Sequence, residues 1–490
     1  MIFRHFLLFT FLTPTLESPI QPTIAIVGAG FAGLRAARRL QELGISYTIF
    51  EGANRIGGRV FPFAYRSGYL EYGAEYVNGE YNEIYEIVKR NALLETTKVE
   101  EEGFETILDG QTIDERIGEV WSKFETKTSE RMEEEAADGR VNNQSVGERI
   151  DAHFGQLLRT RSFSRRDLAT LATLKELFKN QYELEWAARA NDFCLKNFDT
   201  WNVANVREAT LNKFGFKTIL DEMAVGIGIE RIRLNSTVSN IDYSEDKVRL
   251  ALSSGQVHTF DSVIVTSSLG FLKKHRESMF TPKLGALKSE AIERSGFGNT
   301  MKIYLEFERP WWTPRMAAIQ ICDSAASNRL LKSLNVFLPS LWAPNVGVLL
   351  SRLQGFQSKT YFQILIAWLA GDGPEEVAKL SDSQLTTVLN DHISVNLKHQ
   401  FNVTRISRIF RHNWISDEFA LGSYSYISQE SCQGDFDDVR TLGEPILRNH
   451  KPVVCFAGEH TDPDMYQTTV GAARSGLREA DRLHLYYSYT

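Results

Sequence analysis

The 490-residue sequence has only four cysteines, which lie far apart at Cys194, Cys322, Cys432 and Cys455. It contains no Cys-x-x-Cys pair and no cluster of cysteine with histidine, so the pattern argues against a zinc site or a dithiol redox centre. We therefore expect no metal site. An exported chain could form a disulfide from these cysteines, but the sequence does not indicate which of them would pair.

The sequence also lacks long apolar runs and an excess of positive charge. No segment is long and apolar enough to cross a membrane. The formal net charge is −7, which argues against a nucleic-acid partner, because such a partner calls for a basic surface. The 43% hydrophobic and 24% charged residues are typical of a globular protein. The length predicts two domains, or one domain interrupted by another.

The first residues carry a targeting pattern. Arg4 and His5 precede a short apolar run at residues 6–12, and a polar stretch follows the run. This order predicts a secretory signal peptide over residues 1–18 and hence an extracellular protein. An apolar extension ahead of the first strand is the alternative. Three glycosylation sequons, which agree with export, occur at Asn143, Asn235 and Asn402.

A strand, a glycine-rich turn, a helix and a second strand follow in direct succession. Residues 23–27 are a β-branched run, residues 34–43 predict a helix, and residues 46–50 predict a strand that ends at Glu51. The turn carries Gly28, Gly30, Ala32 and Gly33. The glycines let the backbone approach a pyrophosphate, and the helix N-terminus offers it free N–H groups. The carboxylate after the second strand can bind a ribose diol. The unit predicts dinucleotide binding; a chance glycine turn is the alternative.

A second glycine loop narrows the choice of dinucleotide. Gly57 and Gly58 precede Arg59, whose guanidinium could clamp phosphates as a charged donor. A nicotinamide-binding fold does not need this loop, so it favours FAD. Another glycine-bracketed turn begins at Gly73 and Ala74.

The rest of the chain predicts a second domain inserted into the first. Apolar residues recur at helical spacing before residue 230, and from residue 233 the period changes to two, as in a β-meander. We predict an α/β fold: a discontinuous Rossmann-type FAD-binding domain with an inserted α+β substrate domain, which has a mixed sheet plus helices. The FAD-binding domain is assigned residues 22–111, 231–275 and 441–490, and the substrate domain is assigned 112–230 and 276–440.

The chain resembles the flavin amine oxidase family over nearly all residues after 22. The likeness rests on five blocks in order: Gly28–Gly33, Glu51 with Gly57-Gly58-Arg59, Gly73-Ala74, Met301-Lys302-Ile303 with Pro310-Trp311-Trp312, and Ala457-Gly458-Glu459-His460-Thr461. Two further phrases, Gly422–Tyr426 and Arg474–Asp481, look most like the polyamine oxidase and spermine oxidase branch.

The resemblance implies where FAD would lie. The residues implied near its adenosine are Glu51 and Val238, and those near its pyrophosphate are Gly30, Arg59 and Glu459. The residues implied near its flavin are Tyr76, Val77, Trp414 and Val470. The implied cofactor site also includes Gly73, Ala74, Gly458 and Thr469.

The resemblance also implies the groups around the substrate. Lys302 matches a strand lysine that holds a water against flavin N5. Tyr424 matches one wall of an aromatic cage around the substrate nitrogen, to which Trp414 is also assigned. Thr468 occupies the place of a second tyrosine in some relatives. Asn78 stands where polyamine oxidases carry a histidine or glutamate that meets the substrate amine.

These features together predict an FAD-dependent oxidase of amines, most of all of polyamines such as spermine, spermidine or their acetylated forms. Its partners are the amine and molecular oxygen, and its products are an aldehyde, a shorter amine and hydrogen peroxide. Ser423 stands where monoamine oxidases carry the cysteine that is bonded to FAD, so we expect a noncovalent flavin.

Two other functions stay open. Asn78 and the half-open cage would fit a secreted FAD-binding scaffold without catalysis, although a scaffold has no use for Lys302. An L-amino-acid oxidase would carry an arginine directly after Gly73-Ala74, where this sequence has Glu75 and Tyr76. The sequence does not indicate the oligomeric state.

Overall fold

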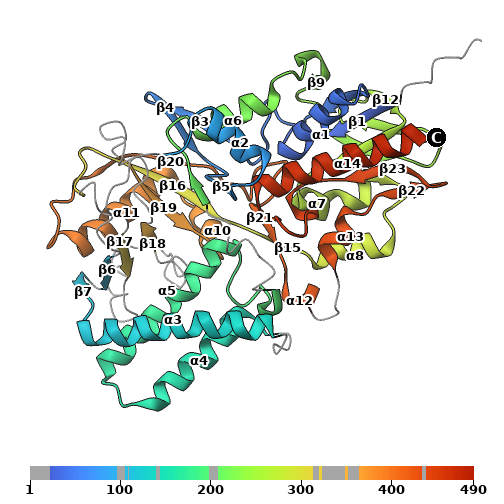
Figure 1. Cartoon of the computed structure of the whole chain (residues 1–490). Coiled ribbons are helices and arrows are strands. Elements are labelled where there is room, and N and C mark those ends of the chain that lie inside the picture. The colour runs from blue at the N-terminus through green and yellow to red at the C-terminus, as the bar shows by residue number, and fades with distance from the viewer. Residues whose placement is uncertain are drawn as a thin grey trace, which may run out of the picture.

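The fold is built on two large sheets, with helices around each of them (Figure 1). The structure is a computed structural model, and it describes residues 22–95, 105–108, 110–138, 144–197, 208–312, 319–322, 348–350, 364–432 and 437–489. The predicted signal peptide and the sequon at Asn143 lie outside these residues.

The first large sheet is rich in parallel strands. Its six strands lie in the order β22 (Ile446–Arg448), β23 (Lys451–Phe456), β13 (Ser262–Val265), β1 (Thr23–Val27), β2 (Ser46–Phe50) and β9 (Ile232–Arg233). All neighbours pair in parallel except β22, which is antiparallel to β23 at one edge. The inner strands are almost continuously apolar and buried, as expected when helices cover both faces of a sheet.

Two helices from opposite ends of the chain pack beside this sheet. They are α1 (Phe31–Glu42) and α14 (Thr469–Tyr489), which lie side by side in Figure 1. A Cβ on Gly476 would lie 2.1 Å from the carbonyl oxygen of Ala32, so only glycine permits this close approach. Their apolar faces share one core cluster with α2 (Glu83–Arg90) and α6 (Gly215–Ala224).

A smaller, four-stranded sheet continues this half of the molecule. Its strands are β12 (Val257–Phe260), β11 (Val248–Leu252), β10 (Val238–Asp242) and β14 (Phe280–Thr281). Around it lie α7 (Leu269–Met279), α8 (Ala286–Arg294) and α13 (Asp438–Gly443), whose buried residues belong to the same core cluster. The predicted β-meander after residue 233 is confirmed by β10, β11 and β12.

The second large sheet has seven strands and mixed direction. Their order is β20 (Ile406–Arg411), β16 (Met301–Phe307), β19 (Ile364–Leu369), β18 (Val348–Leu350), β17 (Ile319–Cys322), β6 (Glu105–Leu108) and β7 (Gln111–Thr112). Helix α11 (Asp382–Leu397) packs its apolar face on strands β16 and β19, and the short helix α10 (Gly373–Ala378) precedes it.

Three long helices form a separate layer at the lower left of Figure 1. They are α3 (Glu115–Ala137), α4 (Val146–Thr160) and α5 (Arg165–Trp186), which confirms that this part of the chain is mainly helical. Capping boxes at Ser145 and Ser164 satisfy the first N–H groups of α4 and α5.

Three short antiparallel strand pairs lie outside the larger sheets. They are β3 (Pro62–Tyr65) with β4 (Gly68–Glu71), β5 (Tyr76–Asn78) with β8 (Glu208–Thr210), and β15 (Gly296–Gly298) with β21 (Tyr424–Tyr426). A disulfide joins Cys194 to Cys432, which lies in the short helix α12 (Gln429–Cys432). The sequence alone did not indicate this pairing. Cys455 is a buried free thiol, and the side chain of Cys322 lies outside the described side chains.

The fold confirms the predicted α/β class with a parallel-rich sheet. Several elements extend past the predicted domain boundaries: β6 belongs to the seven-stranded sheet, β14 pairs with β10, and α6 and α8 pack in the core clusters of the parallel-rich half. Local periodicity predicts a strand but does not indicate which sheet it joins. The boundaries at residues 111 and 275 stay predictions, because sheet membership alone does not define a domain.

Candidate active site

One cavity of about 1210 Å³ contains most of the residues that the sequence singled out. The predicted site residues that line it are Gly28, Gly30, Ala32, Glu51, Arg59, Gly73, Ala74, Tyr76, Asn78, Val238, Lys302, Trp414, Tyr424, Gly458, Glu459, Thr468 and Thr469. The cavity is larger than the usual site for a drug-sized ligand, so it has room for a dinucleotide and a substrate together.

Three predicted cofactor residues lie behind the cavity wall instead. Val77 and Val470 are buried in the core between α1, α14 and their neighbours. A Cβ on Gly33 would lie 2.0 Å from the carbonyl oxygen of Gly28, so this glycine serves the contact between helix and turn. Motif spacing identifies such residues, but it does not distinguish a residue that lines a cavity from one that packs behind the lining.

The glycine turn presents an open cradle at the start of α1. Gly28 has a φ of +106°, which a side chain would disfavour. At Gly30, an added Cβ would meet only the carbonyl oxygen of Gly57, at 4.0 Å, so its space faces the cavity. Within the described residues, no side chain caps the N-terminus of α1. The free N–H groups and the positive end of the helix dipole therefore form an anion site.

Glu51 binds this turn to the strand that follows. One carboxylate oxygen of Glu51 accepts the N–H of Ala29 at 2.7 Å, and the other accepts that of Ala53 at 2.8 Å. Burial raises the pKa of Glu51, although these two N–H groups oppose the shift. Each carboxylate oxygen retains a lone pair for a hydroxyl group of a ligand.

Arg59 and Glu459 form an ion pair in the cavity wall. The guanidinium Nη1 of Arg59 donates to Glu459 at 2.8 Å and to the carbonyl oxygen of Ser423 at 2.7 Å. Glu459 also accepts hydrogen bonds from the Ser425 hydroxyl and the Gln467 N–H. Burial opposes ionisation, but the charge of Arg59 and these donors outweigh it and lower the pKa of Glu459. The arginine is thus held in place at the cavity.

The start of α14 presents polar groups to the same cavity. The Thr468 hydroxyl is a helix cap: it accepts the N–H of Gly471 at 2.9 Å. The Thr469 hydroxyl is buried and has no hydrogen-bond partner within the described part of the chain. A buried hydroxyl at a helix N-terminus without a partner is unusual in a folded protein and fits a bound polar ring system.

Lys302 projects from β16 into the cavity and forms a buried ion pair. Its Nζ donates a short hydrogen bond to Oε2 of Glu75, and both side chains are at least nine-tenths buried. The same Nζ lies 5.2 Å from the centre of the Trp368 ring, within the range of a cation–π contact. The sequence predicted Lys302 but missed Glu75 as its partner, because the two are 227 residues apart.

Two aromatic residues of the same cavity lining are held by hydrogen bonds to the backbone. Trp414 is buried, and its Nε1 donates to the carbonyl oxygen of Tyr72 at 3.1 Å. The hydroxyl of Tyr424 donates to the carbonyl oxygen of Leu184 at 2.8 Å. The Ser423 hydroxyl is engaged with the backbone of Thr300.

Sequence reasoning missed several acidic and aromatic residues of the lining. They include Glu75, Trp368, Glu185 and Glu208. Glu185 and Glu208 come from segments whose sequence shows only helical periodicity and charge, so no local signal pointed to them.

The geometry fits FAD. The open cradle at Gly30, the fixed Arg59 and the unpartnered hydroxyl of Thr469 line one continuous cavity. No group of His, Cys, Asp or Glu residues suited to a metal ion occurs within the described ranges. No helix among them is long and apolar enough to cross a membrane.

Comparison with known proteins agrees with this geometry. The family described as flavin containing amine oxidoreductase matches residues 31–484. The chain belongs to this family. The family is flavin-containing, which implies FAD as cofactor and an amine as substrate, and the recognition of the family from its five sequence blocks is confirmed.

Relatives with a named activity match nearly the whole chain. It is 27% identical to human "Peroxisomal N(1)-acetyl-spermine/spermidine oxidase", over 95% of this chain and 96% of the relative. It is 25% identical to "Probable polyamine oxidase 5" of Arabidopsis thaliana, over 95% and 98%. It is also 25% identical to human "Lysine-specific histone demethylase 2", over 94% of this chain and 53% of that relative.

Proposed function

We propose that this member of the flavin amine oxidase family is an oxidase of polyamines that binds FAD without a covalent bond. The observation that carries the proposal is the cavity itself, where the Gly30 cradle, the Lys302–Glu75 pair and the Tyr424 wall share one space. The polyamine oxidases among its relatives support the substrate class.

The proposal assigns a role to each part of the cavity. The turn at Gly28 and Gly30, with Arg59, would hold the pyrophosphate, and Glu51 would hold the ribose. The unpartnered hydroxyl of Thr469 and the start of α14 would face the flavin. The Ser423 side chain offers no thiol for a covalent link. We also propose the domain organisation predicted from the sequence, in which a substrate domain is inserted into a discontinuous FAD-binding domain.

Bound FAD supplies the two-electron acceptor that no side chain can provide. The chain's own residues exclude bulk water and orient the amine between Tyr424 and Trp414. The buried pair of Glu75 and Lys302 holds the ammonium of Lys302 at the cavity wall. The net reaction takes a secondary amine, oxygen and water to an aldehyde, a shorter amine and hydrogen peroxide.

We also propose that the protein is exported and glycosylated. The signal-like order of residues 1–18 supports export, as does the disulfide between Cys194 and Cys432, because disulfides persist in oxidising compartments. Asn235 and Asn402 are both exposed, but Asn235 lines the cavity, so Asn402 is the better glycan site of these two sequons.

A peroxide assay tests the catalytic proposal. The FAD-loaded protein receives spermine, spermidine, their acetylated forms or a neutral L-amino acid, and a coupled peroxidase reports hydrogen peroxide. We expect peroxide from a polyamine and none from the amino acid. The variant Lys302→Met tests the role of the lysine. It should lower kcat at least about tenfold, a change of about 1.4 kcal/mol in the activation barrier, while FAD stays bound.

The two other outcomes of this assay assign other functions. Peroxide from the neutral amino acid alone would make the protein an L-amino-acid oxidase. If no amine yields peroxide while FAD stays bound, the protein is a binding scaffold and the proposal is wrong.

A further inference from the structure

Arginines gather at one corner of the helical layer, where the chain turns from α4 into α5. Residues 152–166 contain no aspartate or glutamate but four arginines, which are Arg159, Arg161, Arg165 and Arg166. All four are exposed, and none of them lines the cavity. The corner lies at the lower left of Figure 1, on the opposite side of the molecule from α1 and α14. The cluster is therefore a feature of the outer surface and not of the active site.

The fold leaves the charge of these arginines uncompensated. None of the four forms an ion pair with a carboxylate in the part of the chain that the structure describes. Arg166 donates to Oε1 of Gln111 at 3.2 Å, but this partner is a neutral amide. The nearest acid along the chain, Asp167, accepts a hydrogen bond from Arg116 at 2.9 Å. Neighbouring positive charges repel one another, so an anion placed among them would be stabilised.

The positions of these charges do not serve the stability of the helices. Arg159 lies in the last turn of α4, where the helix dipole favours a cation. Arg165 and Arg166 instead begin α5, at the end of the helix where the dipole disfavours positive charge. Residues that are placed against a local preference without compensation are typical of functional sites. The cluster therefore points to a ligand outside the chain.

Short segments with several arginines are typical of surfaces that bind heparin-like polysaccharides or nucleic acids. A guanidinium group donates two parallel hydrogen bonds to a tetrahedral oxyanion, and sulfate esters offer such oxygens. The disulfide between Cys194 and Cys432 favours the polysaccharide, because disulfides persist in the oxidising compartments outside the cytosol. The ligand that these observations favour is a sulfated polysaccharide.

A lipid surface fits the corner less well. Attachment to a membrane surface needs apolar side chains that insert between the lipids, in addition to positive charge. Phe163, at the centre of the turn, packs against the core of the three helices. Leu168, which is 40% exposed, is then the one exposed large apolar side chain between residues 157 and 168. The corner is thus suited to a soluble polyanion.

We propose that Arg159, Arg161, Arg165 and Arg166 bind a sulfated polysaccharide of the cell surface or the extracellular matrix. The choice of this polyanion rests on the proposed export, but the site uses no part of the cavity and is independent of amine oxidation. Binding through this corner would hold the protein where sulfated chains are dense, while the cavity lies elsewhere in the molecule.

Surface plasmon resonance with immobilised heparin tests the site on the purified FAD-loaded protein. The matched ligand is heparin from which the sulfate groups have been removed, because it keeps the carboxylates and the sugar backbone. In Arg161→Gln with Arg165→Gln we expect the Kd for heparin to rise at least about tenfold. The slope of log Kd against log salt concentration should also fall by about two, because each lost arginine releases about one counterion fewer.

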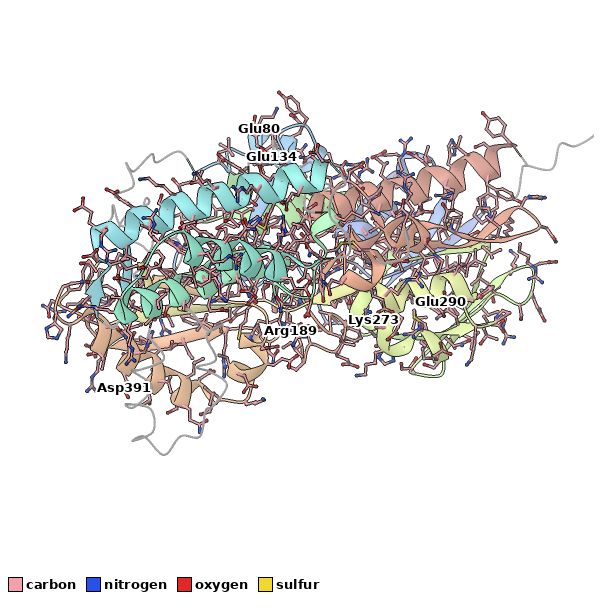
Figure 2. The ribbon with its side chains drawn as sticks, turned by 90° about the horizontal axis from the view of Figure 1, so that it is seen from below. Glu80, Glu134, Arg189, Lys273, Glu290 and Asp391 are labelled. Atoms are coloured by element: carbon pink, nitrogen blue, oxygen red, sulfur yellow. A yellow bond between two sulfur atoms is a disulfide. The ribbon has the colours of Figure 1, made fainter. Side chains whose placement is uncertain are left out.

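A control variant makes the same change of charge elsewhere. Lys274→Gln with Lys283→Gln removes two exposed cations from α7 and the turn that follows it, and should change the Kd for heparin less than about threefold. Figure 2 labels the adjacent Lys273, which lies apart from α4 and α5. Thermal unfolding of both variants should match that of the parent protein, because all the substituted side chains are exposed.

Several results would overturn the proposal. Heparin without sulfates that binds as tightly as heparin, or an arginine variant that binds heparin like the parent, would do so. Tighter binding to a DNA duplex, or to vesicles of anionic phospholipid, would assign the corner to another partner. None of these measurements uses an amine, so their outcome is separate from that of the peroxide assay.

Discussion

At the scale of single residues, Glu71 is a buried carboxyl group whose pKa is strongly raised. It lies behind the Lys302–Glu75 pair, with Oε1 bound to the N–H of Phe216 and with Oε2 buried and unpartnered among the described residues. Burial raises its pKa to about 8; the charge of Lys302 opposes this shift and that of Glu75 adds to it. Glu71 is therefore a neutral carboxylic acid at pH 7.

This acid makes stability depend on pH. The ordinary pKa is 4.5, so between about pH 4.5 and 8 the folded chain holds a proton that the unfolded chain has released. The contribution of Glu71 to the free energy of unfolding therefore falls as the pH rises through this range. In Glu71→Gln the fall should be smaller by an amount on the order of a few kcal/mol, because each pH unit corresponds to about 1.4 kcal/mol.

Urea unfolding from pH 5 to 8.5 measures this difference. Subtracting the curve of Glu71→Gln from that of the parent protein removes the contributions of other buried groups, such as Glu183. The exposed Glu245→Gln variant is the control and should follow the parent. A difference curve that stays flat would show that Glu71 ionises in the folded protein as it does in water.

At the scale of elements, Gly30 and Gly33 of the same turn have different roles, one in cofactor binding and the other in packing. Gly30 has a φ of −75° and open space at its Cβ position, whereas a Cβ on Gly33 would lie 2.0 Å from a backbone oxygen. Gly30→Ala should leave the apoprotein as stable as the parent but weaken FAD binding at least about tenfold. Gly33→Ala should destabilise the apoprotein itself, by about 1–3 kcal/mol.

Thermal or denaturant unfolding of the apoproteins and fluorescence titration with FAD distinguish the two effects. If Gly30→Ala binds FAD as tightly as the parent, the cradle does not hold the pyrophosphate. If Gly33→Ala unfolds like the parent, the contact between α1 and its turn carries no stability.

Local signals predicted some elements well. Strands β1 and β2 occupy the expected residues. A buried parallel strand appears in the sequence as a short run rich in β-branched residues, and a nearby glycine marks its end. Helix α1 begins at Phe31, three residues before the expected start, because Gly30 already serves as its N-cap. Motif spacing likewise identified Lys302, Arg59 and Glu459, which all line the cavity.

At the scale of the whole molecule, pairing across the chain decided what the sequence could not predict. The partner of Lys302 is 227 residues away, and the strand that carries Glu208 pairs with one that lies 130 residues earlier. The disulfide between Cys194 and Cys432 spans 238 residues. No periodicity within a segment encodes such contacts, so charge and type alone left these residues without a role.

Segments that are far apart in the sequence come together around a single cavity, and the central claim concerns this cavity. Segments from the N-terminal turn, β16, β21 and the start of α14 line this cavity, and the claim is that they hold FAD against an amine. An anaerobic visible spectrum of the FAD-loaded protein, before and after adding spermine, tests this most directly. We predict that the flavin bands bleach with spermine and return when air is admitted. Bands that stay unchanged with every amine would contradict the account.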